Sequence, residues 1–247
     1  MTDSAGGFRE DLSARARAFI DTFSAEEALP LDSWVRAPDI ASEWEGLAEA
    51  RRIASVFDDS YRGISVLSLG GPLKGAVRLG VYGVRPVWRT EQGMIVFRCG
   101  IHPTIQCAVV TSVDGRLGCS WTSEFSPLFD SIQLYIENAA AWAVVQGWRY
   151  VAVGDVITSS VLSVFDELSV DPLVSGGLAA WWIAADHAMV TQQRLNPAIG
   201  GRPQISILAR TPAAKEQARS RLVKTGIDPL AFQTADFIGR VPTLSPG

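Results

Sequence analysis

Three cysteines and one histidine form the most compact set of residues that could bind a metal. Cys99, His102, Cys107 and Cys119 follow the spacing C-x2-H-x4-C-x11-C. Zinc prefers thiolate and imidazole ligands that converge as a tetrahedron. Cys107 and Cys119 lie within apolar runs that are typical of strands, where a free cysteine is commonly buried as a small hydrophobic residue. We therefore interpret the cysteines as core residues and expect no metal and no other cofactor.

A second set of residues could supply acid–base groups. Asp186 and His187 are adjacent, and Asp166 and Glu167 precede them in the chain. A carboxylate near an imidazole can orient it as a general base. However, adjacent residues of a helix diverge by about 100°, so Asp186 and His187 would not face each other in a helix. We interpret His187 as a buried structural residue, with pairing to Asp166 or Glu167 on a pocket wall as the open alternative.

The eight tryptophans are more than a core of this size needs. Aromatic side chains and arginine are favoured anchors at protein interfaces. Trp88 and Arg89 follow a proline, and Trp121 ends an apolar run, so we expect these three residues near the surface, as partner-binding residues. The alternative is that each tryptophan fills the core beneath a helix.

Composition excludes several classes of protein. Charged residues make up 19% of the 247 residues, hydrophobic ones make up 47%, and the net charge is -4. A disordered chain would be less hydrophobic and more highly charged. A nucleic-acid-binding protein usually carries a basic surface, whereas the pI here is about 5.3 and no Lys/Arg block occurs. The sequence also lacks the dinucleotide-binding, P-loop, nucleophile-elbow and H-E-x-x-H motifs.

Cysteine usage and hydropathy predict a cytoplasmic location. Three cysteines provide no disulfide framework. The N-terminal residues contain no apolar segment typical of a signal peptide. The most apolar window, residues 176–190, is too short to span a membrane and contains Asp186 and His187, so it predicts a buried helix.

The middle of the chain has the patterns of an antiparallel sheet. Short β-like runs occupy residues 64–121, and turn residues separate them. Asp114-Gly115, between two apolar runs, predicts a hairpin with a type I′ turn. Helices are predicted around this sheet, including an N-terminal one and a long one that begins at Ser126-Pro127 and ends near Gly147.

The end of the chain is expected to be mostly helical. One helix should run from Asp171-Pro172 towards Arg194, and another from Thr211-Pro212 to Gly226, with a strand at 204–209 between them. The predicted class is α+β, with a mainly antiparallel central sheet flanked by helices and a mostly helical C-terminal extension. We place the domains at 1–150, with the N-terminal helices and sheet, and at 151–247.

Residues 44–148 resemble the SUKH superfamily. A helix leads into Val56-Phe57-Asp58-Asp59-Ser60-Tyr61-Arg62, and a glycine turn (GGPLKG) leads into the sheet. The turn VDGRLG then precedes a loop and a helix that carries Ser131-Ile132-Gln133-Leu134-Tyr135-Ile136. Many bacterial members of this family are immunity proteins that neutralise a toxin by direct binding. The resemblance implies a non-enzymatic protein-binding module without catalytic residues.

Two other functions remain open. One is a cytosolic biosynthetic enzyme with an aromatic-lined pocket, in which Asp166, Glu167, Asp186 or His187 provides acid–base groups. The other is a structural subunit that uses the apolar helix as an oligomer interface. For the immunity-type function, an acidic protein with aromatic residues on its sheet suits a basic protein partner, such as a nuclease or deaminase toxin. Nucleic acid and membrane are not expected partners, and the oligomeric state is left open.

Overall fold

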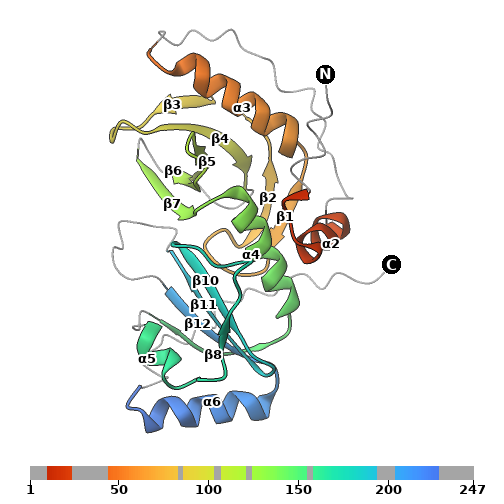
Figure 1. Cartoon of the computed structure of the whole chain (residues 1–247), viewed down its shortest axis with the longest axis vertical. Helices are drawn as coiled ribbons and strands as arrows, with labels where there is room; N and C mark the ends of the chain where they lie inside the picture. Colours follow the sequence, from red (N-terminus) through yellow and green to blue (C-terminus); the bar gives the residue numbers. More distant parts are fainter. Residues whose placement is uncertain are drawn as a thin grey trace.

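The chain folds as an α+β protein built on two antiparallel sheets (Figure 1). The structure, a computed structural model, describes residues 10–23, 44–82, 86–102, 107–120, 124–154, 158–193 and 204–227. The first sheet is curled, and helices pack against it, which confirms the predicted fold class. Among the described residues, no helix is both long enough and apolar enough to cross a bilayer.

The first sheet, sheet A, contains the meander that the sequence predicts between residues 64 and 121. Its strands follow the order β1-β2-β4-β5-β6-β7, and β3 pairs with β4. Every pairing in it is antiparallel, as expected for strands joined by short turns. The strands are β1 (Ser65–Ser68), β2 (Gly75–Leu79), β3 (Val87–Arg89), β4 (Ile95–Ile101), β5 (Ala108–Ser112), β6 (Leu117–Ser120) and β7 (Phe125–Phe129).

The predicted hairpin at Asp114-Gly115 joins β5 to β6, but its loop is longer than a two-residue type I′ turn. Thr111 pairs with Leu117, and the Ser112 amide donates to the Arg116 carbonyl, so three residues form the loop. Gly115 has a φ of 94°. A glycine in the left-handed region is typical of three-residue hairpin loops. Asp114-Gly115 therefore predicted the position of the hairpin correctly, but the predicted type I′ turn is wrong.

Three helices pack against sheet A: α2 (Ala14–Phe23), α3 (Leu47–Tyr61) and α4 (Ile132–Val144). Their apolar faces share one core with the sheet, which buries Phe19, Phe57, Phe97 and Tyr135. Phe57 meets Phe97 edge to face, with ring centroids 5.4 Å apart. Because Phe97 lies on β4, this contact positions α3 across that strand.

Helix α4 begins five residues later than the sequence predicted. Ser131 caps it, because its side chain accepts a hydrogen bond from the Leu134 amide. Ser126 and Pro127 belong to β7 instead. Proline has no N–H to donate, but β7 is the last strand in the sheet order, and an edge strand tolerates that loss.

The second sheet, sheet B, corrects the prediction of a mostly helical C-terminal extension. Its strand order is β8-β12-β11-β10-β9. The first strand spans the predicted boundary at residue 150. The strands are β8 (Arg149–Gly154), β9 (Ser169–Val170), β10 (Ala179–Ile183), β11 (His187–Gln192) and β12 (Gln204–Ala209), and the helices are α5 (Thr158–Leu162) and α6 (Pro212–Lys224).

The apolar window at residues 176–190 forms the hairpin of β10 and β11, so the predicted helix from Asp171-Pro172 towards Arg194 is wrong. All six residues of β11 are buried because sheet B is covered on both faces. A strand covered on both faces loses its polar–apolar alternation and is then hard to distinguish from a buried helix. The helix predicted from Thr211 is confirmed, since Thr211 caps α6, Pro212 is its first residue, and Gly226 lies just beyond the C-cap at Thr225.

Helix α4 is the element that joins the two sheets (Figure 1). Ile136 and Ala139 pack into the core of sheet A, whereas Trp142 and Val145 pack against residues of sheet B. Residues 135–142 are all buried, which is typical of a helix enclosed on every side. Helices α5 and α6 cover the other face of sheet B.

Candidate functional site

Trp88 lies on the face of sheet A that points away from α3. It pairs with Val96 of β4, and both side chains belong to a small apolar cluster separate from the main core. Val87 and Phe97, the neighbouring residues on the two strands, point into the core beneath the helices. Because successive side chains of a strand alternate between faces, Trp88 and Val96 lie on the opposite face. Trp88 is only partly buried there.

This cluster forms an apolar strip across strands β3 to β7. Val96 and Val110 lie at its centre, where they are fully buried. Gly118 follows on β6, where a Cβ would come within 2.8 Å of the Phe125 ring, so the absent side chain makes room for that ring. We call this set the outer strip. Its members are Trp88, Met94, Val96, Ala108, Val110 and Phe125.

Arg89 does not join the outer strip, because it follows Trp88 on the strand and points to the other face. Its guanidinium lies over the Trp44 ring, 5.0 Å from the ring centroid. The same group donates to the Glu45 carbonyl over 3.1 Å, beside the start of α3. Trp121, the third predicted partner-binding residue, lies outside the described residues.

His187 pairs with Glu167, as the open alternative in the sequence allowed. Its Nδ1 lies 3.3 Å from a Glu167 carboxylate oxygen, and its Nε2 lies 3.1 Å from the Ala214 carbonyl oxygen. One Arg221 nitrogen donates to both Glu167 oxygens, over 2.7 and 2.9 Å. Both ring nitrogens of His187 therefore face acceptors within the protein, and its side chain is 4% exposed. That geometry suits a structural tie between β11 and α6 better than a general base.

Of the other two predicted acid–base residues, Asp166 hydrogen-bonds the Glu167 side chain, and neither residue lines a pocket with this pair. Asp186 is exposed at the turn between β10 and β11, and Asp166 is exposed before β9. Burial acts to raise the pKa of Glu167, but hydrogen bonds and the nearby Arg221 guanidinium lower it by more. The Glu167 pKa therefore lies below its usual value, and the charged form is favoured. Glu167 is therefore a carboxylate whose charge is already compensated by Arg221.

The cysteines are free and buried. Cys99 and Cys119 belong to the core of sheet A, as the apolar runs around them indicated. Burial raises the pKa of the Cys99 thiol, which keeps it protonated. The His102 ring hydrogen-bonds the Lys74 carbonyl through Nε2, over 2.9 Å. Within the described ranges, no three His, Cys, Asp or Glu residues are grouped as they would be around a metal ion.

A pocket of about 230 Å³ opens at the C-terminal end of α4. Its walls include Trp142, Trp148 and Tyr150, so it is aromatic-lined, as the enzyme alternative required. However, among the described residues its lining contains none of the acid–base residues considered above, and Lys74 is the charged side chain that borders it. The pocket and the His187–Glu167 pair are therefore separate features.

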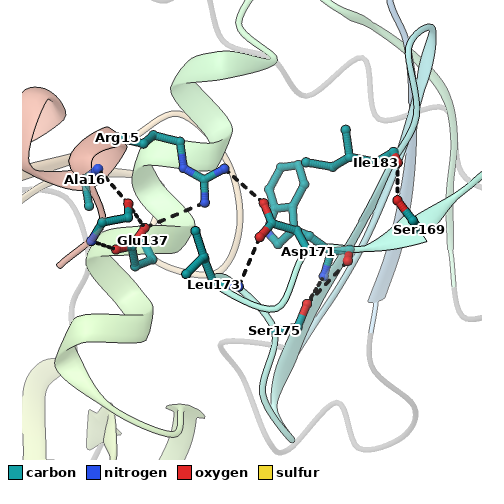
Figure 2. A network of polar contacts seen from close by, with 10 residues as sticks. Arg15, Ala16, Glu137, Ser169, Asp171, Leu173, Ser175 and Ile183 are labelled. Atoms are coloured by element: carbon teal, nitrogen blue, oxygen red, sulfur yellow. Dashed lines mark hydrogen bonds and ion pairs between the residues drawn. The ribbon is translucent and has the colours of Figure 1, made fainter. Parts of the chain in front are cut away.

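A polar network that sequence reasoning missed links the start of α2 to α4 and to Asp171 (Figure 2). Glu137 is buried, and its two oxygens accept from the Ser13 amide over 2.6 Å and from the Ser13 hydroxyl over 2.7 Å. Arg15 lies between Glu137, at 3.7 Å, and Asp171, at 3.0 Å. Asn138, the next residue of α4, accepts from Gln192 of β11 over 2.9 Å. The signal in the sequence was a polar pair, Glu137-Asn138, in the middle of a helix that is otherwise mostly apolar.

No protein-family model matches the chain, and no curated protein or solved structure is found to be similar to it.

Proposed function

We propose that this protein is a non-enzymatic module that acts by binding another protein through the outer strip of sheet A. The observation that carries the proposal is a partly exposed tryptophan, Trp88, at the edge of an ordered apolar cluster opposite the helices. Rigid aromatic anchors of this kind dominate binding energy at protein interfaces. The sheet holds Trp88 in register with Val96, so little ordering is required on binding.

The charged residue beside the strip also suits a protein interface. Arg98 of β4 is exposed and pairs in register with Val110. Arginine is enriched in interfaces because its planar group donates several hydrogen bonds and also packs on apolar surfaces. The net charge of -4 adds only weak long-range attraction to a basic partner. Val96, Val110 and Phe125 are already buried in the free chain and support the surface from beneath. The contacts with a partner come from the partly exposed members of the strip and the residue at its edge: Trp88, Met94, Ala108 and Arg98.

Within this function, we propose the immunity type, in which binding blocks a toxin. The support is the resemblance of residues 44–148 to the SUKH superfamily, together with the engagement of His187 and Glu167 by their own neighbours. Catalysis would instead need acid–base groups directed at a substrate.

The test is capture of a partner by the tagged full-length chain in its native host, followed by reconstitution from purified components. We expect a stoichiometric complex that Trp88→Ala or Met94→Glu weakens by at least about tenfold. The matched control is Trp148→Ala, which removes a partly buried tryptophan from outside the strip. For the immunity type, the partner alone should arrest cell growth, and the wild-type chain, but not Trp88→Ala, should restore it.

Two results would count against the proposal. One is a reconstituted complex whose affinity is the same for wild type, Trp88→Ala and Met94→Glu, since binding would then use another surface. The other is turnover of a metabolite that Trp88→Ala leaves intact and His187→Ala abolishes in a protein that remains folded.

A further inference from the structure

The pocket at the end of α4 has features of a small-molecule site that the protein-binding proposal does not use. It lies where the loop between β1 and β2 meets α4, β8 and β12. Its volume of about 230 Å³ is below the range of roughly 300–1,000 Å³ that is usual for drug-sized ligands. A ligand of one or two fused rings is therefore the appropriate size.

Trp142, at the centre of the aromatic lining, is held in place before any ligand binds. Trp142 is 4% exposed and packs face-on against Gly70, where a Cβ would come within 2.5 Å of the indole. Its ring also meets Trp181 edge to face, with centroids 5.0 Å apart, and Tyr150, with centroids 6.5 Å apart. A rigid aromatic wall favours a planar ring, because stacking then needs no further ordering of the protein.

The charge at the pocket favours an anion. Lys74 is exposed at its border, and the described lining contains no carboxylate. The loop that carries Lys74 is held by the hydrogen bond from His102 to the Lys74 carbonyl. The C-terminus of α4, near Val145, contributes an opposing partial charge of about half a unit, which is smaller than the full charge of lysine. A cationic ligand would meet the ammonium group without any compensating acid.

We propose that this pocket binds a small planar aromatic carboxylate, with its ring against the partly exposed Trp148 and Tyr150, the buried Trp142 supporting that wall, and its carboxylate towards Lys74. Gln146 also lines the pocket, and its side-chain amide is a further group that can donate a hydrogen bond.

The test uses three probes that share a naphthalene ring and differ in charge, applied to the full chain: 2-naphthoate, neutral 2-naphthamide and cationic 2-naphthylmethylammonium. Calorimetry and ligand-observed NMR should show saturable binding of 2-naphthoate, at least about tenfold tighter than 2-naphthamide at low salt. Lys74→Met should remove this preference, and Trp148→Ala should weaken binding of both probes. Lys224→Met, on the exposed side of α6, is the matched control and should change neither affinity.

The inference is overturned if 2-naphthoate shows no saturable binding, if the amide or the ammonium probe binds as tightly, or if Lys74→Met keeps the wild-type preference. It is independent of the outer strip, because Trp88→Ala should retain naphthoate binding even where it loses a protein partner.

Discussion

Glu137 is a carboxylate whose burial depends on donors from another part of the chain. Its side chain is 7% exposed, and it accepts two hydrogen bonds from Ser13, the residue before α2. The Ser13 hydroxyl also accepts from the Ala16 amide, so Ser13 caps α2 at the same time. A buried charge is tolerated only when donors and counter-charges replace water, and here Ser13 and Arg15 provide them.

Glu137→Gln should lower the free energy of unfolding by about 1–3 kcal/mol, because an amide group would then face the Ser13 donors in a buried site. Urea denaturation measures the change. The control is Glu216→Gln on α6, where the side chain is 70% exposed and the expected change is within about 0.5 kcal/mol. Equal stability of the two variants would show that the network contributes nothing.

The second residue-scale prediction concerns His102 and pH. Burial disfavours the charged ring and lowers the His102 pKa, although the hydrogen bond to the Lys74 carbonyl partly opposes that shift. The unfolded chain then binds a proton near pH 6.5 more readily than the folded chain does. Stability should therefore fall as the pH decreases through about 6.5 towards the folded pKa.

Urea titrations at several pH values between about 8 and 5 test this dependence on each side of the unfolded pKa. His102→Gln should show a smaller loss of stability over that window than the wild type. A loss of the same size in both proteins would assign the dependence to other groups.

At the scale of elements, sheet A depends on a close approach of β6 and β7. A Cβ at Gly118 would lie 2.1 Å from the Ser126 carbonyl oxygen, and backbone cannot move aside as a flexible side chain can. Gly118 also leaves room for the Phe125 ring in the outer strip. A glycine at this position therefore allows both the strand pairing and the apolar face.

Gly118→Ala should lower the free energy of unfolding by about 1–3 kcal/mol through overpacking. The control is Gly177→Ala, where the nearest contact of an added Cβ, at 3.6 Å from Asp130, is ordinary. Chemical denaturation of the two variants compares them directly. Near-wild-type stability of Gly118→Ala would mean that β7 can separate from β6 at little cost.

For the whole molecule, α4 makes the two sheets mutually dependent. Its residues contribute to the cores on both sides, and Arg15–Asp171 and Asn138–Gln192 add polar links between the halves of the chain. Removing either sheet would expose Trp142 or Ile136, both of which are buried. The two sheets are therefore expected to unfold together.

Equilibrium unfolding should show one transition, coincident by tryptophan fluorescence and far-ultraviolet circular dichroism. A fragment that ends at residue 148 should fail to fold, because the apolar side of α4 that faces sheet B would be left in water. Two separate transitions, or a folded fragment, would show that the halves are independent domains.

Local patterns in the sequence determined strands β1 to β6 of sheet A, the cap and end of α6, and the burial of the cysteines, because each depends on neighbours in the chain or on simple alternation. The tertiary structure alone decided the rest. A strand buried on both faces carries no alternation, so β11 could not be distinguished from a helix. The faces to which Trp88 and Arg89 point, the pairing of His187 with Glu167, and the donors around Glu137 all depend on contacts between distant segments. Such contacts are set by the packing of distant segments, so they cannot be predicted from any single stretch of the sequence.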